Sequence, residues 1–470
     1  MKRLATALVF CLMVLLFTGC QGESGTPSRA TTSTTTVFHT TVTKSTLSRP
    51  TLSGTDATSS TTSESSTASS TTSTTVSSSS GTVTSSSTKT TTMSSSVATT
   101  TNSSSVVLPT EVRGAWVSYF ELESLFKSCT TVQQTKNALD GLFQLLQNNR
   151  INVVYFHVRA NSDAYYDSQY FKATASTKSL LDQGFDPLTY AVETAHKRGM
   201  QLHAWVNPYR AGKNTAYLVS DVPTFQDSAG RYYYVPTSSK TQQLVLNGIR
   251  ELVNNYDIDG IQYDDYFYPK GVLQESTPAD FETSDYNAVN GTMSVGDWRR
   301  AAVNRLIAGT HTITSQKGKI FGVSPAYSAQ DTYDHLYADV KLWLSQSGYV
   351  DYLCPQLYFG FDHATAAFDD LVTTWMGYTR HASVQLHVGL ALYKIGLKSD
   401  TYAGTLGKTE WAKHNDVMKR SVEYLRSKNI SGIAFYSATY FDPASCGSTF
   451  AAEHDVTVAK QEIQNLLTVL

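Results

Sequence analysis

The chain has 470 residues, which is enough for one large domain with additional segments, and its composition changes sharply along its length. Its 37 basic and 39 acidic side chains leave a formal net charge of -2 at pH 7. Without a basic field, nucleic acid is not an expected partner, and polar or neutral partners fit the composition better.

The first twenty residues have the pattern of a secretory signal peptide. Lys2 and Arg3 supply the charged start, residues 8–17 form the apolar run, and small residues precede Cys20. The run is too short for a comfortable bilayer span. Residues 17–20 (FTGC) resemble a bacterial lipobox, although Phe17 stands where Leu is more usual. We therefore expect a lipoprotein signal peptide at residues 1–20, with lipidation at Cys20 and an extracytoplasmic, membrane-anchored location. Plain secretion is the alternative.

Serine and threonine dominate residues 21–108, and large apolar side chains are almost missing. Such a segment cannot bury enough apolar surface to offset the conformational entropy that folding removes. Tracts of this composition are typical of glycosylated or wall-spanning stalks. The segment is predicted to be a disordered tether that lets an anchored domain reach away from the membrane.

Three cysteines remain beyond the signal peptide and Cys20, and their wide spacing matches neither a metal motif nor a disulfide framework. Cys354 lies in an apolar run and is predicted to be a small core residue. A disulfide between Cys129 and Cys446 is a less expected alternative.

From residue 109 to residue 470, short apolar runs alternate with amphipathic helical patterns. One such pattern has apolar residues at 245, 249, 252, 253 and 256, which keeps one helix face apolar. The predicted strands are Val112–Ser118, Asn152–Val158, Gln201–Val206, Ile258–Tyr263, Ile320–Ser324, Val350–Gln356, Gln385–Leu390 and Gly432–Tyr436.

Eight βα units favour an α/β fold whose parallel sheet closes into a (β/α)8 TIM barrel. An open doubly wound sheet is the alternative, but no strand is followed by GxGxxG or by GxxxxGK(S/T), so a nucleotide crevice would lack its phosphate cradle. Long insertions follow the second, third and fourth strands, at residues 159–186, 207–240 and 264–297. Because barrel active sites are built from loops at this end of the strands, these insertions are expected to shape the site.

The segment IDGIQYDDYFYP, residues 258–269, places Asp264 and Asp265 side by side where the fourth strand ends. Two neighbouring carboxylates repel each other, so one pKa should rise and that group can hold a proton near neutral pH. The pair shares one site only if the pleat has already ended at Asp264, since adjacent residues of a regular strand point to opposite faces. A helix cap or turn is the alternative role. The flanking aromatic rings, on which sugars can stack, favour an acid that cleaves acetals.

The other predicted strands also end in polar and aromatic residues, as expected if one mouth of the barrel carries the chemistry. Rings stack on sugar faces and side-chain amides pair with hydroxyl groups, so these residues indicate a neutral polyhydroxylated ligand. The residues expected to bind substrate are Arg159, Asp163, His203, Trp205, Asn207, Tyr209, Arg210, Tyr266, Tyr327, Gln356 and Tyr436.

Two other kinds of site fit the sequence less well. His157 and His203 with Asp264 could bind zinc, but no HExxH or similar motif occurs, and no metal or cofactor is expected. A serine nucleophile lacks the GxSxG elbow that would present it.

The chain resembles glycosyl-hydrolase-like family 10, formerly a domain of unknown function (187), over essentially all of residues 111–470. Seven ordered segments carry the resemblance: EVRGAWVSYF, NVVYFHVRANSDAYY, FDPLTYAVETAHKRGMQLHAWVNPYR, IDGIQYDDYFYP, FGVSPAY, VDYLCPQLYF and ISGIAFY. The resemblance implies a (β/α)8 fold and a secreted or lipid-anchored bacterial protein. For some members it implies cleavage of peptidoglycan glycan strands, particularly strands stripped of stem peptides. It implies a site at residues 264–266, at residues 207–210 (NPYR), and at Gln356 and Tyr358.

A more distant similarity, to barrel hexosaminidases and chitinases that use the substrate's own N-acetyl group, implies catalytic roles for Asp264, Asp265 and Tyr358. One Asp would protonate the leaving oxygen, the other would orient the acetamido nitrogen, and Tyr358 would hold its carbonyl. The sequence leaves open which Asp does which. A plain two-carboxylate mechanism would need a second acid from elsewhere, with Asp163 and Asp331 as the nearest candidates.

The sequence therefore predicts a monomeric cell-envelope glycosidase. Its expected substrate is an N-acetylhexosamine-containing polysaccharide, and peptidoglycan glycan strands are the leading candidate. A non-catalytic glycan-binding lipoprotein is the alternative from a different class. A third alternative is a deacetylase or other metal hydrolase that uses His157 and His203.

Overall fold

The computed structural model of the protein describes residues 105–271, 273–289 and 292–470. The predicted signal peptide, the lipidation site Cys20 and the tether up to residue 104 lie outside the described residues. Val106 donates its backbone N–H to the Gly318 carbonyl (2.7 Å), and the Val107 carbonyl accepts from the Gln201 side chain (2.7 Å). Residues 106–107, which the sequence assigns to the tether, thus contact the folded domain at the amino ends of the strands.

Among the described residues, eight parallel strands form a closed barrel, which confirms the predicted (β/α)8 fold and excludes an open doubly wound sheet. All eight predicted strands are present, and β13 pairs with β1 to close the circle. In order around the barrel they are β1 (Val112–Val117), β2 (Val153–Arg159), β5 (Gln201–Val206), β9 (Gly260–Tyr263), β10 (Ile320–Val323), β11 (Tyr352–Leu353), β12 (Gln385–Leu390) and β13 (Gly432–Tyr436).

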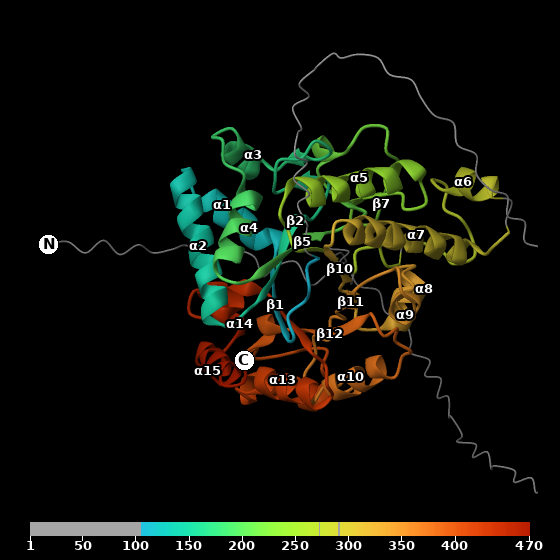
Figure 1. Ribbon diagram of the computed structural model, residues 1–470. Helices are drawn as coiled ribbons and strands as arrows, with labels where there is room; N and C mark the ends of the chain where they lie inside the picture. Colours follow the sequence, from blue (N-terminus) through green and yellow to red (C-terminus); the bar gives the residue numbers. More distant parts are fainter. Residues whose placement is uncertain (1–104, 272, 290–291) are drawn as a thin grey trace, which may run out of the picture. The chain divides into compact units, whose positions relative to one another are not determined.

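Helices surround the strands as an outer layer (Figure 1). Local sequence explains where they begin: Ser118 and Thr131 start the first two helices through capping boxes closed by Glu121 and Gln134. The helices that flank the barrel are α1 (Tyr119–Ser128), α2 (Val132–Asn148), α4 (Pro187–Lys197), α5 (Ser239–Asn255), α7 (Val295–Gln316), α8 (Ala329–His335), α9 (Val340–Ser345), α10 (Phe368–Met376), α13 (Val417–Ser427) and α15 (Val456–Leu467). In the described part of the chain, no helix is long and apolar enough to cross a membrane.

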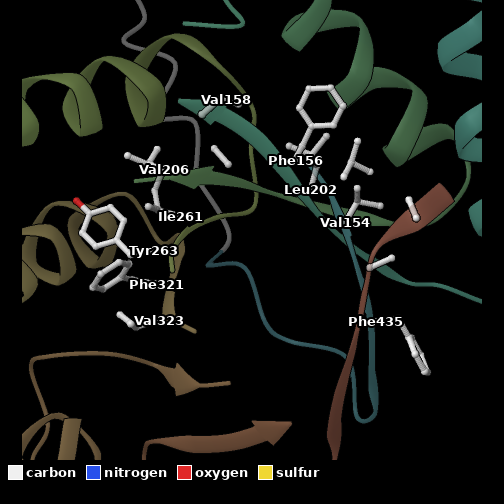
Figure 2. Packing of buried hydrophobic residues seen from close by; sticks show 14 of the residues in the cluster. Val154, Phe156, Val158, Leu202, Val206, Ile261, Tyr263, Phe321, Val323 and Phe435 are labelled. Atoms are coloured by element: carbon white, nitrogen blue, oxygen red, sulfur yellow. The ribbon is translucent and has the colours of Figure 1, made fainter. Parts of the chain in front are cut away.

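The main apolar core lies between the outward faces of the strands and the helices. Phe156 of β2, Leu202 of β5 and Ile261 of β9 are fully buried there, and Figure 2 shows them among their neighbours. These strands are apolar along nearly their whole length because helices cover one face and the barrel interior covers the other. The apolar face predicted for α5 is also buried, with Ile249 and Leu252 at its centre.

Inside the barrel, ring side chains on some strands lie opposite glycines on neighbouring strands. The facing pairs are His203–Gly260, Tyr352–Gly322 and His387–Gly432. A Cβ atom at Gly322 would collide with the Tyr352 ring, and one at Gly432 with the His387 ring. The glycines therefore make room for the His203, Tyr352 and His387 rings, which form a ring layer inside the barrel, toward the amino ends of the strands.

A chain of hydrogen bonds connects this layer to the residues above it. Trp116 Nε1 donates to Gln262 Oε1 (2.6 Å), and Gln262 Nε2 donates to the Tyr352 hydroxyl (3.2 Å). The Tyr352 hydroxyl also lies 3.3 Å from His203 Nδ1. Burial lowers the pKa of His203 to about 4, so its imidazole is neutral at physiological pH.

The insertions after three strands form small structures of their own at the carboxyl ends of the barrel strands. The first contains β3 (Asp163–Ala164), β4 (Lys172–Ala173) and α3 (Ala175–Leu181). The second forms an antiparallel sheet of β6 (Arg210–Gly212), β8 (Tyr232–Tyr234) and β7 (Thr224–Gln226), in that order. The third contains α6 (Thr283–Ala288).

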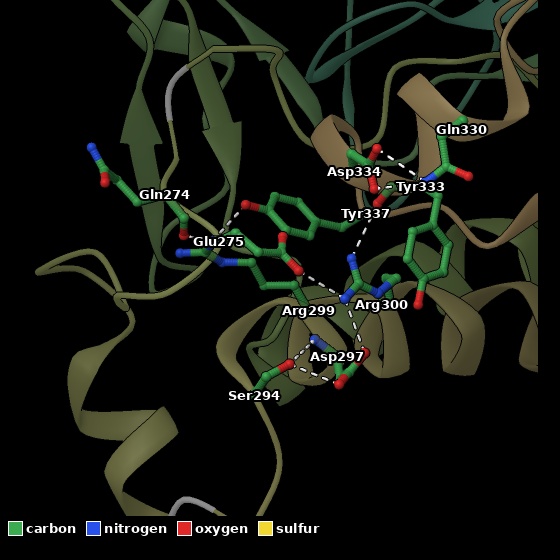
Figure 3. A network of polar contacts seen from close by, with 10 residues as sticks. All are labelled: Gln274, Glu275, Ser294, Asp297, Arg299, Arg300, Gln330, Tyr333, Asp334 and Tyr337. Carbon is green, nitrogen blue, oxygen red and sulfur yellow. Dashed lines mark hydrogen bonds and ion pairs between the residues drawn. The ribbon is translucent and has the colours of Figure 1, made fainter. Parts of the chain in front are cut away.

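Two buried arginines of α7 connect the third insertion to the barrel helices (Figure 3). Arg299 is ion-paired with Glu282 and donates to the Tyr337 hydroxyl (2.8 Å). Arg300 pairs with Glu275 (2.8 Å). The two arginines donate to carboxylates in the insertion, Glu275 and Glu282, and Arg299 also donates to Tyr337 outside it. Charge-assisted bonds therefore hold the insertion after β9 in place.

The cysteines follow the main sequence prediction. Cys354 is fully buried among the apolar residues inside the barrel. The Cys446 thiol donates to the backbone carbonyls of Asp442 (3.5 Å) and Thr439 (3.6 Å) instead of bonding to Cys129, so the alternative disulfide was wrong.

The Gly322–Tyr352 contact generates a first prediction. Gly322→Ala should lower the free energy of unfolding by about 1–3 kcal/mol, because its methyl group overlaps a ring that has no room to move. Gly141→Ala is the matched control, since a Cβ there meets nothing within 4 Å in the middle of α2. That change should be neutral or stabilising. Urea unfolding of both variants checks the difference, and equal stability would show that the ring layer tolerates a methyl group.

A buried carboxyl on α15 generates a second prediction. Glu462 accepts from the Met418 backbone N–H (2.6 Å), and burial raises its pKa to about 7. Because the folded pKa exceeds the unfolded value, this group's stabilising contribution is complete at pH 4 and is lost as pH rises through 7. Glu462→Gln should therefore be more stable than the wild type at pH 8, by on the order of 2 kcal/mol, with the difference shrinking toward pH 4. Glu423→Gln, at an exposed carboxyl of α13, is the control in denaturation at several pH values. A difference independent of pH would contradict this account.

Candidate active site

The pleat of β9 stops where the aspartate pair begins. The strand ends at Tyr263, which points outward with its hydroxyl 2.8 Å from Thr310 of α7. The next side chain, Asp264, points inward, and its Oδ2 accepts from Trp205 Nε1 (3.2 Å). Asp265 follows in a turn, and its Oδ1 accepts from Gln356 Nε2 (3.2 Å). The structure thus meets the condition under which the two carboxyls can share one site.

The two carboxyl groups differ in access. Asp264 is 3% exposed, and its Oδ1 accepts from the Tyr266 backbone N–H (3.0 Å), so both of its oxygens have fixed donors. Asp265 is only partly buried, and among the described residues no other side chain donates to its Oδ2. Asp264 is therefore the fixed member of the pair, and Asp265 is the member with an oxygen available to a ligand.

Burial shifts the acidity of both groups. It raises the pKa of Asp264 well above its usual range, and the charge of Asp265 raises it further. Burial also raises the pKa of Asp265, although the hydrogen bond from Gln356 acts in the opposite direction. Two coupled carboxyls in this setting titrate as a unit and retain a proton at a higher pH than an ordinary aspartate would.

One wall of the site is a stack of His157 on Trp205, with ring centroids 3.6 Å apart and planes 11° apart. Trp205 Nε1 is shared between Asp264 and Asn207 Oδ1 (3.1 Å), and Asn207 donates to the Ala160 carbonyl (3.0 Å). Burial lowers the pKa of His157 well below its usual range, so it stays neutral. This wall is rigid because each of its rings has a packed or hydrogen-bonded neighbour.

The opposite wall is a group of tyrosines. Tyr358 stacks on Tyr436 with centroids 5.9 Å apart, and Tyr393 meets both rings edge-on at 5.9 and 6.1 Å. Tyr436 also lies 6.4 Å from Trp205, which joins the two walls. Such faces suit the apolar side of a sugar ring.

Arg210 and Asp163 lie on the insertions at the mouth. The Arg210 guanidinium lies over the Tyr266 ring (4.7 Å) and farther from the Tyr119 ring (5.9 Å). Asp163 lies close enough that its charge raises the pKa of Tyr119, and its own pKa is raised by burial. Arg210 therefore belongs to the surroundings of the aspartate pair, and Asp163 to those of Tyr119.

Three predicted binding residues lie elsewhere. His203 is buried in the ring layer beneath Trp205. Tyr209 is buried in the outer core, where its hydroxyl accepts from Gln242 (3.3 Å). Arg159 lies over the Phe171 ring (4.5 Å) outside the barrel. None of the three reaches a ligand held at the aspartate pair.

The rim holds two further candidates. Tyr327 is 42% exposed and meets the Phe359 ring edge-on at 4.8 Å, so it is available only to a ligand that extends to the rim. Asp331, a candidate second acid, is ion-paired with Lys270 on the surface (2.7 Å). A surface ion pair gives a poor proton donor for a bond cleaved inside the mouth.

Four residues of this site are not among the expected catalytic and binding residues: Trp116, Tyr119, Glu121 and Tyr393. Trp116 contributes a ring 6.1 Å from Tyr436. Glu121 accepts from Ser437 Oγ (3.0 Å) and from the Thr439 N–H (2.7 Å), which holds the loop after β13 against the end of β1. All four lie at or just after strand ends, which is the signal that could have identified them.

The described residues offer no metal site. Among them, no group of three His, Cys, Asp or Glu side chains is placed to hold a metal ion. The His157 ring stacks on Trp205, and its Nδ1 accepts from the Tyr119 backbone N–H (3.3 Å). His203 lies deeper in the barrel, where its Nδ1 is hydrogen-bonded to the Tyr352 hydroxyl. The two histidines therefore do not converge on Asp264.

Sequence comparison finds that the chain is similar to glycosyl hydrolases. The family model "Glycosyl hydrolase-like 10" matches residues 111–403. Glycosyl hydrolase YngK of Bacillus subtilis (strain 168) is 31% identical over 319 residues, which are 62% of this chain and 62% of that protein. Glycosyl hydrolase DigH of Escherichia coli (strain K12) is 33% identical over 287 residues, which are 53% of this chain and 64% of that protein. The matches thus span less than two thirds of each relative.

Solved structures are similar at lower identity. The glycoside hydrolase domain of PgaB (BpsB) from Bordetella bronchiseptica is 11% identical with a TM-score of 0.46, covering 76% of this chain and 99% of that one. A glycoside hydrolase family 20 β-N-acetylglucosaminidase is 12% identical with a TM-score of 0.42, covering 76% and 73%.

The family match covers more than half of the chain and includes both aspartates, Arg210 and Gln356. It ends before β13, the strand that closes the barrel. The resemblance is confirmed over residues 111–403, which contain six of the seven sequence segments, and the chain belongs to the Glycosyl hydrolase-like 10 family.

Proposed function

We propose that this protein is a glycoside hydrolase that cleaves N-acetylhexosamine-containing glycans of the cell envelope, with peptidoglycan glycan strands as substrate. The observation that carries the proposal is the Asp264–Asp265 pair, whose carboxyl pKa values are raised, beside two groups of stacked aromatic rings. A protonated carboxyl beside a second carboxyl is what acetal hydrolysis requires. Family membership and the names of the relatives support a hydrolase.

The difference in access supports separate roles for the two carboxyl groups. Asp265 is the proton donor, because its Oδ2 is available to the glycosidic oxygen. Asp264, fixed by Trp205 and Tyr266, orients the N–H of the substrate's acetamido group. Tyr358 lies near Asp265, whose charge contributes to raising the tyrosine pKa, and its hydroxyl holds the acetamido carbonyl.

In this reaction the Asp265 proton passes to the glycosidic oxygen as the bond from C1 to that oxygen breaks, and the bonding electron pair leaves with the oxygen. The acetamido carbonyl oxygen forms a bond to C1 from the other face. Water then attacks C1, the bond from C1 to the carbonyl oxygen breaks, and the Asp265 carboxylate takes the water proton. The rigid Trp205 and Tyr436 rings keep the sugar oriented throughout.

The proposal predicts the effect of amide substitutions. Asp265→Asn should lower kcat at least a hundredfold, because it removes the proton donor, and Asp264→Asn should also lower kcat. Release of sugars from purified, peptide-free glycan strands, weighed by mass spectrometry, measures both. Asp331→Asn is the control, since its carboxyl is already paired with Lys270 on the surface. Asp163→Asn tests the plain two-carboxylate alternative.

The same assay at several pH values tests the acidity of the pair. Activity should fall as pH rises through the raised pKa of the donor. Asp264→Asn should move that fall to lower pH, because the pair then loses the carboxyl whose pKa is raised further by its neighbour's charge. Binding of the glycan without any release by the wild type would reject the hydrolase and favour a glycan-binding lipoprotein.

We further propose that lipidation at Cys20 anchors the protein to the outer face of the cell membrane. The FTGC sequence and the Ser/Thr-rich residues 21–108 support this location. Residues 106–107 contact the amino ends of the strands, the face opposite the aspartate pair, which would leave the mouth open to the wall. Cys20→Ala should move the protein from the membrane fraction to the soluble or secreted fraction. Retention of Cys20→Ala in the membrane would contradict lipidation.

A further inference from the structure

Arg210 carries a positive charge at the mouth that no contacting acid neutralises. Among the described residues it makes no ion pair, its Nε is buried without a hydrogen-bond partner, and its side-chain hydrogen bond goes to the uncharged Tyr119 hydroxyl. The other buried arginines differ. Arg299 pairs with Glu282, Arg300 pairs with Glu275, and Arg159 donates to backbone carbonyls. Arg210 alone of these four lies beside the aspartate pair.

The surroundings of Arg210 hold its guanidinium in place through uncharged tyrosines. The guanidinium carbon lies over the Tyr266 ring, 4.7 Å from its centroid, and 5.9 Å from the centroid of the Tyr119 ring. Its backbone lies opposite Tyr233 in the β6–β8 pair, within the insertion after β5. A guanidinium stacked on a ring keeps its in-plane N–H groups free, and their fork matches the two oxygens of a carboxylate.

The position of Arg210 is tied to the acid pair. Tyr266, on which the guanidinium stacks, donates its backbone N–H to Asp264 Oδ1 (3.0 Å). Arg210 attracts both carboxyls, but the pKa values of Asp264 and Asp265 remain raised, so it does not act as their ion-pair partner. Arg210 is half-buried, and its Nε is buried without a partner. Leaving a charged donor unpaired there is costly, and a ligand that supplies the partner removes this cost.

We propose that Arg210 binds a carboxylate of the substrate, so that a sugar beside the scissile bond must be acidic. This inference rests on the proposed function and names a specificity residue for that site. Two sources share the chemistry: the lactyl carboxylate of a muramic acid residue and the C6 carboxylate of a uronic acid. In both, a planar carboxylate would accept two parallel N–H bonds from the guanidinium.

Binding in an inactive background tests the inference separately from cleavage. Asp265→Asn and the double variant Asp265→Asn/Arg210→Gln are titrated calorimetrically with peptide-free muramic-acid glycan fragments, with the same fragments after reduction of their carboxyls to alcohols, and with hyaluronan fragments. Arg210→Gln should weaken binding of one carboxylate-bearing glycan about tenfold to a hundredfold, and it should leave binding of the reduced fragments unchanged. The glycan that shows the loss identifies the source of the carboxylate.

Two further variants in the same background sharpen the result. Arg210→Lys keeps the charge but loses the fork, so its affinity should lie between those of arginine and glutamine. Arg231→Gln is the matched control: it removes a positive charge from the same insertion, but its guanidinium is already paired with Asp227 (2.6 Å). Its effect on carboxylate binding should be small.

The inference is overturned if Arg210→Gln weakens carboxylate-bearing and reduced glycans equally, or changes neither. Thermal unfolding of each variant identifies any loss that comes from misfolding, and Arg210→Lys then serves as the test. If the wild type releases no sugar while the Arg210-dependent preference persists, the hydrolase proposal fails and the carboxylate site stands.

Discussion

The burial of two adjacent carboxyl groups is the constraint on which the rest of the site depends. Asp264 and Asp265 can hold a proton because side chains fill the barrel beneath them, and burial raises the pKa of both carboxyls. The interior of the barrel is filled by ring side chains that lie opposite glycines. The hydrogen bonds from Trp116 to Gln262 and from Gln262 to Tyr352 fix the position of these rings along the barrel axis. A looser floor would admit water and return both carboxyls to ordinary acidity.

The walls and the charge at the mouth make different contributions to recognition. The stacked His157–Trp205 pair and the tyrosines around Tyr436 offer apolar faces of fixed orientation. These suit sugar rings in general and do not distinguish one sugar from another. Arg210 is different, because its unused donors favour an acidic group at one position. Orientation thus comes from the rings, and selectivity from the arginine.

The insertions after β5 and β9 position Arg210 and Tyr266, and the barrel strands position the aspartate pair. Arg210 lies on the small antiparallel sheet after β5, and Tyr266 begins the insertion after β9. The insertion after β9 is held to α7 by Arg299 and Arg300, and Arg300 of α7 also donates to the Tyr333 carbonyl of α8 (Figure 3). Mutations in this network should therefore affect the site through the position of Tyr266, although none of its members touches the aspartates.

Local sequence was sufficient for the eight strands, the α5 face and the aromatic character of the mouth, because each follows from periodicity or from neighbouring residues. Side-chain direction was decided only by the tertiary structure. His157 and Arg159 should share a face by alternation, but the β2–β5 register shifts between them, so His157 stacks on Trp205 and Arg159 turns outward to Phe171. Likewise, His203 faces the interior one layer too deep to reach a ligand, and Glu121 joins β13 across the barrel closure. Such outcomes depend on pairing between distant strands, which no local pattern in the chain encodes.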